Sequence, residues 1–277
     1  MQRIKRGWEL SKQSWAVLRA DSSLAVFPVL GFICSAIAFV LIAAPGAVVA
    51  SAQDNEWYAA PFIAIAAYAA TFFGIYFNVA LAAAANRSID GVDTTLSDGL
   101  SVANARKGVI AQWALVQLVI GFLIQALEEL LSESPAGRLV GAVVGGVLDA
   151  AWALMTFFVA PVLALEDVGP KQALDRSFAL IKERWGESVV GTVSIGLAVW
   201  LGLGLPAVLL VLLAFSNPAI PAVALIVPAV LLIITAGVIS SALSVIFRVA
   251  LYRYAVGGST GSAFDDSTLA SAFGAKR

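Results

Sequence analysis

The chain of 277 residues is 60% hydrophobic and only 13% charged, and its mean hydropathy is +0.92. Because a soluble domain carries about 25% charged residues, this composition excludes an ordinary water-soluble protein, and the net charge of −1 excludes a polycationic nucleic-acid-binding protein. Histidine is absent and Cys34 is the single cysteine, which excludes a His/Cys zinc site and an intrachain disulfide. We expect no metal, no other cofactor and no catalytic residue, although composition alone leaves carboxylate or lysine chemistry open.

Six apolar runs are long enough to cross a bilayer, because a helix needs about 20 residues to span roughly 30 Å of hydrocarbon. In chain order they are Leu24–Ala50, Pro61–Ala85, Val109–Leu131, Leu139–Leu165, Val189–Phe215 and Ile220–Phe247. The first run ends near a small-residue triplet of the signal-peptidase type, but it is far longer than the roughly 7–15 residues of a signal sequence. The prediction is an all-α, polytopic membrane bundle of one domain (residues 1–256) followed by a tail (257–277).

The distribution of basic residues predicts the orientation of these spans. Of the 17 Lys and Arg residues, all except Arg138 fall on the same side of the six runs. Short cytoplasmic loops carry an excess of Lys and Arg, so both termini are predicted to be cytoplasmic in a multi-pass protein of the inner or plasma membrane. The outward loops are too short to form a domain.

Each pair of runs follows a short amphipathic segment, which predicts three internal repeats over about residues 3–92, 93–170 and 171–256. Residues at 4-3-4 spacing share one helical face, and in these segments they are mostly apolar. They are Ile4, Trp8, Ser11 and Trp15 in the first segment, Leu174, Phe178, Ile181 and Trp185 in the third, and Leu96, Leu100, Ala103 and Lys107 in the degenerate second. A small residue precedes each second position: Gly7, Gly99 and Ser177. These segments either lie in the membrane interface, with lipid as partner, or cover the bottom of the bundle.

A family resemblance rests on the residues from Pro161 to Glu187. The stretch contains Glu166, Gly169-Pro170 and an Ala-Leu-x-Arg-Ser-x-x-Leu-x-Lys element over residues 173–182. It resembles an uncharacterised, domain-of-unknown-function family of six-span bacterial and archaeal membrane proteins. More distantly, the element is similar to the membrane domain attached to some glycerophosphodiester phosphodiesterases. The soluble phosphodiesterase barrel with its histidines is absent here, so the resemblance implies a fold and no reaction.

Small residues recur at four-residue spacing in the fourth run, at Gly137, Gly141 and Gly145. This spacing lets helix backbones approach closely in lipid. The stripe is predicted to pack against another helix, either of the same chain or of a second copy in a homo-oligomer.

Asp149 is the most unusual residue of the apolar runs. It lies about 16 Å along the helix from Arg138, near the middle of a membrane, where an ionised carboxylate is costly. Two interpretations stay open: a proton- or cation-linked site, or a neutral carboxyl that hydrogen-bonds a neighbour. Gln117, Gln125 and Asn78 are the candidate polar partners, and they either line a polar interior or tie helices together.

The sequence favours a non-enzymatic membrane protein engaged in transport or lipid handling. The alternative is a scaffold that recruits a protein partner through the tail, where Phe264, Leu269 and Phe273 are spaced for a short docking helix.

Overall fold

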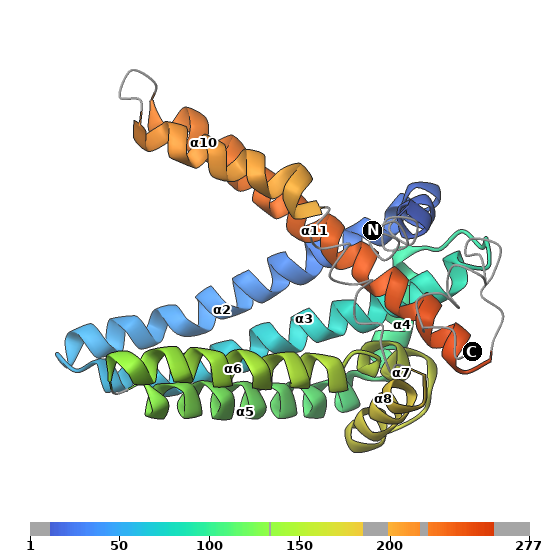
Figure 1. The fold of residues 1–277 in the computed structure, drawn as a ribbon, viewed down its shortest axis with the longest axis horizontal. Coiled ribbons are helices and arrows are strands. Elements are labelled where there is room, and N and C mark those ends of the chain that lie inside the picture. Colours follow the sequence, from blue (N-terminus) through green and yellow to red (C-terminus); the bar gives the residue numbers. More distant parts are fainter. Residues whose placement is uncertain (1–11, 133, 185–198, 217–220, 258–277) are drawn as a thin grey trace. The chain divides into compact units, whose positions relative to one another are not determined.

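The computed structural model describes residues 12–132, 134–184, 199–216 and 221–257, which are drawn as ribbons in Figure 1. Every regular element among them is a helix, so the all-α prediction is confirmed. The chain divides into two compact units. The four-span unit comprises Val29–Ala83 and Ser97–Glu183, and the terminal unit comprises Met1–Pro28, Ala84–Leu96 and Arg184–Arg277. Each is described by itself.

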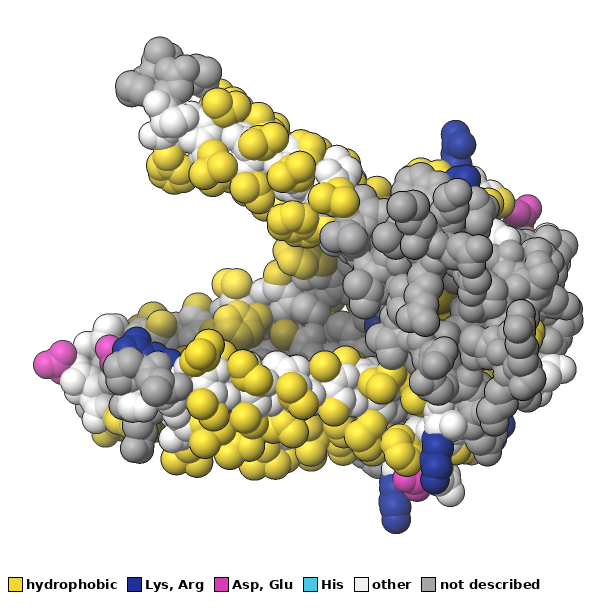
Figure 2. Space-filling view, viewed as in Figure 1, with side chains coloured by type: hydrophobic (Ala, Val, Ile, Leu, Met, Phe, Trp, Pro, Cys, Tyr) yellow, Lys and Arg dark blue, Asp and Glu magenta, His cyan; other side chains and the backbone are white. Residues whose placement is uncertain are grey.

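Five helical stretches in the described part of the chain are long and apolar enough to cross a membrane. They are Ser22–Ala52, Glu56–Ser88, Lys107–Leu131, Gly137–Leu165 and Ala222–Ala255. The shorter apolar helix Trp200–Ser216 belongs to the fifth predicted span, of which residues 189–198 lie outside the described residues. Large side chains are exposed along these helices, among them Leu41 (68%), Phe122 (69%) and Leu139 (71%), and Figure 2 shows apolar side chains covering the shafts of the hairpins. Such surfaces require lipid as their solvent, so this is an integral membrane protein.

Two helical hairpins build the four-span unit. In the first, α2 (Val26–Ala52) and α3 (Ala60–Ser88) flank a short turn, η2 (Glu56–Ala59), whose N-terminus is capped by Asn55. Ser35 Oγ donates a hydrogen bond to the Ala70 carbonyl at 2.8 Å and so ties α2 to α3. The second hairpin pairs α5 (Lys107–Leu131) with α6 (Pro135–Met155), as Figure 1 shows. Ser134 caps α6 by accepting the Gly137 N–H at 2.9 Å, and Pro135 occupies the first turn, where no N–H is needed.

The fourth predicted span, Leu139–Leu165, is not one continuous helix. It breaks over residues 156–158 into α6 and α7 (Val159–Leu165). Pro161 explains the break, since it has no N–H to donate to the Phe157 carbonyl four residues earlier and its ring would clash with that carbonyl. The prediction missed this because hydropathy continues unchanged through the joint.

Two of the predicted amphipathic segments fall on described helices, α4 (Leu96–Ala105) and α8 (Pro170–Arg184). In both, the small residue that precedes the second apolar position is buried, as is the residue four positions later: Gly99 and Ala103 in α4, Ser177 and Ile181 in α8. The predicted single apolar face of α8 is corrected, because Ile181 is buried whereas Phe178 is 47% exposed. The buried face of α8 therefore includes Ser177, which the sequence analysis noted only as the small residue before Phe178.

The terminal unit contains η1 (Ser22–Ala25), a π-helical turn η3 (Trp200–Gly204), α10 (Leu205–Ser216) and α11 (Ala222–Ala255). Asp21 is buried and accepts hydrogen bonds from the backbone N–H and hydroxyl of both Ser23 and Thr94, at 2.5–3.2 Å. The Arg253 guanidinium pairs with Asp90 at 2.6 Å and donates to the Asn86 carbonyl at 2.8 Å. These contacts join the loop after α3 to both ends of the chain's described part.

Candidate functional site: a polar cleft in the four-span unit

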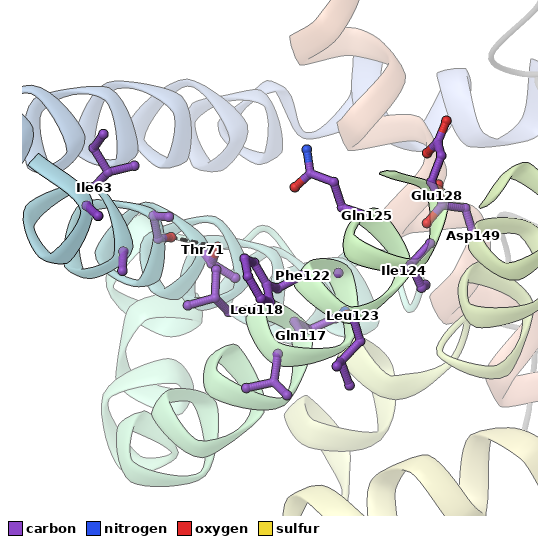
Figure 3. Close-up of a pocket in the computed structure, with 15 residues that line it drawn as sticks. Ile63, Thr71, Gln117, Leu118, Phe122, Leu123, Ile124, Gln125, Glu128 and Asp149 are labelled. Atoms are coloured by element: carbon purple, nitrogen blue, oxygen red, sulfur yellow. Dashed lines mark hydrogen bonds between the residues drawn. The ribbon is translucent and has the colours of Figure 1, made fainter. Parts of the chain in front are cut away.

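One cleft of about 1040 Å³ opens among α3, α5 and α6, and we call it the polar cleft. Its lining comprises residues of α3 between Ala60 and Thr71, residues of α5 between Gln117 and Glu128, and Asp149 of α6. The volume is that of a site for a small organic molecule. Figure 3 shows the cleft with its labelled polar and apolar side chains.

Small side chains on α3 leave the space for this cleft. Ala60, Ala64, Ala67 and Thr71 line it at spacings of four, three and four residues, so they share one helical face. The Thr71 hydroxyl donates to the Ala67 carbonyl of its own helix at 2.8 Å. Across from these residues, Leu118 and Phe122 of α5 supply apolar walls.

The polar groups of the cleft lie along one stripe of α5 and meet Asp149 of α6. Gln117, Gly121, Gln125 and Glu128 recur at three- and four-residue spacing on α5. The Glu128 carboxylate lies against Gly145, one helical turn before Asp149, since a β-carbon on Gly145 would come within 2.8 Å of Glu128 Oε2. Figure 3 shows Glu128 and Asp149 at the same end of the cleft. Two carboxyl-bearing residues thus line one cleft, and no Lys or Arg is among the lining residues that the structure describes.

A tryptophan pair fixes the other side of the stripe. Trp152 Nε1 donates a hydrogen bond to Gln117 Oε1 at 2.5 Å, and its ring stacks on that of Trp113 with centroids 6.0 Å apart. Tyr68 of α3 donates from its hydroxyl to the Ala111 carbonyl of α5 at 3.1 Å. Both contacts hold the helices that border the cleft in register.

The structure brings together three of the four predicted intramembrane polar residues. Asp149, Gln117 and Gln125 all line the polar cleft. Asn78 does not: its side-chain amide donates to the Gly74 carbonyl of its own helix at 2.8 Å. In lipid, an amide side chain most easily donates a hydrogen bond to a backbone carbonyl on the preceding turn of its own helix. A polar residue in a span therefore need not mark a site.

The glycine stripe of α6 faces α5. A β-carbon on Gly141 would come within 2.8 Å of the Glu128 carbonyl oxygen, and one on Gly137 would collide with the Leu131 carbonyl. The stripe thus packs within the chain, and it places Glu128 over Gly145. Of the predicted interfacial residues, Trp15 is 41% exposed and Phe178 is 47% exposed, while Trp8 and Trp185 lie outside the described residues, as do residues 258–277 of the tail.

The sequence itself indicates Glu128, at the outer end of its span, as a plausible polar partner of Asp149, because Glu128 lies three residues after Gln125 and shares its helical face. Phe122 lines the apolar wall, and no sequence signal separates it from the other large residues that face lipid. Within the described residues, no group of three or more His, Cys, Asp or Glu side chains could hold a metal ion.

A family model matches residues 58–262, a stretch that includes every residue lining the polar cleft. The chain belongs to the family of unknown function DUF6159. No curated protein and no solved structure matches the chain. The expected membership in an uncharacterised family is confirmed, whereas the likeness to the membrane domain of glycerophosphodiester phosphodiesterases stays a prediction.

Proposed function

We propose that this protein is a non-enzymatic, multi-pass protein of the cell membrane that binds an amphipathic cation in the polar cleft, as part of transport or lipid handling. The observation that supports the proposal is the presence of two carboxyl side chains, Glu128 and Asp149, at one end of a cleft whose remaining walls are largely apolar. The carboxyl end of the cleft thus suits a cationic headgroup, and its apolar walls suit the alkyl chain of the same molecule.

Charge supplies the selectivity in this proposal. Asp149 lies about 18 Å along the helix axis from Gly137, where the candidate span begins, so it sits deep in the hydrocarbon. Ionised carboxylates at that depth are costly unless they are paired or hydrated. An ammonium group between Glu128 and Asp149 offsets this cost, while an alkyl chain covers Phe122 and Leu118. An anionic or neutral amphiphile of equal length gains only the contacts of its alkyl chain with the apolar walls.

The test measures binding of dodecylamine to the purified protein in nanodiscs by calorimetry, with empty nanodiscs subtracted. Dodecanol and dodecanoate serve as length-matched probes. We expect dodecylamine to bind and the other two to bind at least tenfold more weakly, the loss of roughly one charge-assisted contact of 1.5–3 kcal/mol. Equal binding of all three probes contradicts the proposal.

Matched variants distinguish dodecylamine bound in the cleft from dodecylamine dissolved in the bulk membrane. Asp149→Asn and Glu128→Gln keep side-chain size and remove charge, so each weakens dodecylamine binding. Glu129→Gln removes the adjacent charge of α5, which does not line the cleft, and leaves binding unchanged. If Asp149→Asn binds as the wild type does, the carboxylates do not recognise the ligand. Flux of dodecylamine into proteoliposomes then distinguishes transport from binding alone.

The proposed orientation places both termini in the cytoplasm. The excess of basic residues on one side supports it. In this orientation α8 lies on the cytoplasmic side of the cleft. With Cys34 replaced by serine, single cysteines at Asn55 and Ser134 react with a membrane-impermeant thiol reagent from outside the cell. Reaction from the cytoplasmic side alone reverses the orientation.

A further inference from the structure

The joint between α6 and α7 is completed by a residue from another helix. Ser177 of α8 is fully buried; its hydroxyl donates to the Met155 carbonyl at 2.7 Å and accepts the Phe158 N–H at 3.0 Å. Both groups lost a helical partner at the break, and buried backbone groups are strongly destabilising when they are left unpaired. The joint therefore keeps its geometry only while α8 stays against it.

α8 is itself held by charged contacts at its start. Arg106, at the beginning of α5, donates to the Glu166 carbonyl at 2.7 Å and pairs with the Asp167 carboxylate. Arg176 of α8 pairs with the Glu166 carboxylate at 3.2 Å. These contacts anchor the α7–α8 loop, so a force on α8 acts on the joint through Ser177 rather than being absorbed by the loop.

The outer face of α8 is built to meet a membrane surface. Lys171, Asp175, Phe178 and Lys182 follow one another at four-, three- and four-residue spacing and share one helical face. All four are exposed, with Phe178 at 47%, so the face carries two ammonium groups and one carboxyl group. An aromatic side chain between two lysines whose stems reach the headgroups is the pattern of an interfacial helix, and two ammonium groups favour anionic lipid. The Ser177 hydroxyl points to the joint from the neighbouring, buried face.

The joint lies close to the polar cleft along α6. Asp149 lines the cleft six residues before Met155, and Trp152 between them holds Gln117 of the cleft by its indole N–H. Less than two helical turns therefore separate the carbonyl that Ser177 binds from the carboxylate that would bind the ligand. A helix is stiff over that distance, so a change at the joint reorients Asp149 and Trp152 together.

We propose that anionic phospholipid headgroups bound by α8 control the affinity of the polar cleft by keeping Ser177 in the α6–α7 joint. The two states are a joint with Ser177 bonded to Met155 and Phe158 and a joint without it. Anionic lipid stabilises the first state, because only then does α8 hold Lys171 and Lys182 at the surface. The second half of this inference rests on the proposed function of the cleft, and the first half does not.

The first experiment tests the joint without any cleft ligand. Hydrogen exchange of the segment around Phe158 is measured in nanodiscs of phosphatidylcholine alone and of phosphatidylcholine mixed with phosphatidylglycerol. The expected result is exchange slowed roughly tenfold by the anionic lipid, at the lower end of ordinary coupling between sites. Combined Lys171→Gln and Lys182→Gln abolishes the lipid effect, whereas Arg19→Gln, which removes another exposed charge, does not. Equal rates of hydrogen exchange in the two lipid mixtures for the wild type overturn the proposal.

A second variant reports on the transmission itself. Ser177→Ala is expected to speed exchange around Phe158 in both lipid mixtures, and to remove the lipid dependence even though both lysines remain. If Ser177→Ala retains the full lipid effect, the hydroxyl does not couple α8 to the joint. The lysine pair, which lies on the exposed face, keeps the test decisive should Ser177→Ala fail to fold.

The last experiment measures dodecylamine affinity in the same two nanodisc mixtures. Anionic lipid concentrates any amine at its surface, so the affinity of the wild type is divided by that of the double lysine variant in each mixture. A ratio that rises several-fold with anionic lipid supports control of the cleft, and a ratio that stays constant overturns it. If exchange at the joint depends on lipid but dodecylamine does not bind at all, the proposed function fails while the lipid-controlled joint stands.

Discussion

The α5–α6 and α10–α11 hairpins solve the same packing problem with different chemistry. The membrane-spanning stretches of α5 and α6 each have a mean hydropathy of 1.9, while that of α11 reaches 2.8. The first hairpin closes through glycine, with Gly141 and Gly145 against Glu128, and it carries the Gln117–Trp152 hydrogen bond. In the second, Gly237 has no atom within 4 Å of an added β-carbon, and Ala207 and Ala229 are among the fully buried residues.

This difference teaches where function can reside in a lipid-embedded chain. Apolar side chains gain little by leaving lipid for one another, so an apolar hairpin needs only close van der Waals contact. A polar stripe has a cost in lipid and persists where it has partners or a ligand. The α5–α6 hairpin, with α3 beside it, has both a polar stripe and a cleft.

The largest expected effect comes from filling the tightest approach of α6 to α5. Gly141→Leu places side-chain atoms where a β-carbon alone would meet the Glu128 carbonyl at 2.8 Å. Backbone cannot give way as a side chain can, so we expect destabilisation of about 3 kcal/mol, the upper end for overpacking. Thermal unfolding in detergent measures it. The control is Gly146→Leu, which has no atom within 4 Å of its added β-carbon and leaves the melting temperature nearly unchanged. Equal melting of both variants would falsify the close approach.

The second effect lies outside the spans, at Asp21. Burial raises the pKa of its carboxyl, but the hydrogen bonds from Ser23 and Thr94 together outweigh that effect and lower the pKa below 3.8. Asp21→Ala leaves these donors unpaired, and we expect a loss of about 2 kcal/mol. Because the folded pKa is lowered, the stabilisation is present above the unfolded value of 3.8 and disappears as the pH falls through the folded pKa. Thermal melts of wild type and variant converge in acid, whereas Asp93→Ala, in the exposed loop nearby, melts as the wild type at every pH.

A smaller effect distinguishes the two hairpins directly. Gln117→Leu removes the acceptor of the Trp152 indole N–H, and we expect a loss of about 1 kcal/mol because the partly buried donor stays unpaired. Thr235→Val in α11 removes a hydroxyl that bonds the Leu231 carbonyl of its own helix at 2.8 Å. That change is expected to fall within about 0.5 kcal/mol of zero. Blue-shifted tryptophan emission in the first variant, and none in the second, is the accompanying signature, because leucine replaces the polar acceptor of the Trp152 indole. A cost at Thr235 as large as at Gln117 removes the contrast between the hairpins.

The smallest effect is expected at the Asp90–Arg253 pair. The hydrogen bond from Arg253 lowers the pKa of Asp90 below 3.8, against a smaller opposing effect of burial. The Asp90 side chain is 45% exposed, so water screens the pair and Asp90→Asn costs under about 1 kcal/mol. The loss is visible above pH 3.8 and vanishes as the pH falls through the lowered pKa. It also shrinks in high salt, and a salt-independent loss in urea melts contradicts the ion-pair origin.

Particular residues show how far sequence reasoning reached. Hydropathy located the spans because lipid forces every apolar helix to be long, and the glycine spacing at Gly141 and Gly145 predicted a packed face. Asp149 was recognised since charge is rare in a span. The break over residues 156–158 escaped notice, although Pro161 was its cause, because a proline in a span either kinks or starts a helix and the sequence does not say which.

The sequence by itself determined the solvent of this protein, its helical class and the residues that do not belong in lipid. Those properties follow from composition and period, which are local. Tertiary structure alone decided which polar residues meet. It placed Asp149 and Glu128 in one cleft, left the Asn78 amide bonded to its own helix, and brought Ser177 to the backbone of Phe158, nineteen residues earlier in the chain. Meeting depends on the rotation of each helix about its axis, which is set by packing between helices and not by the hydropathy of any one of them.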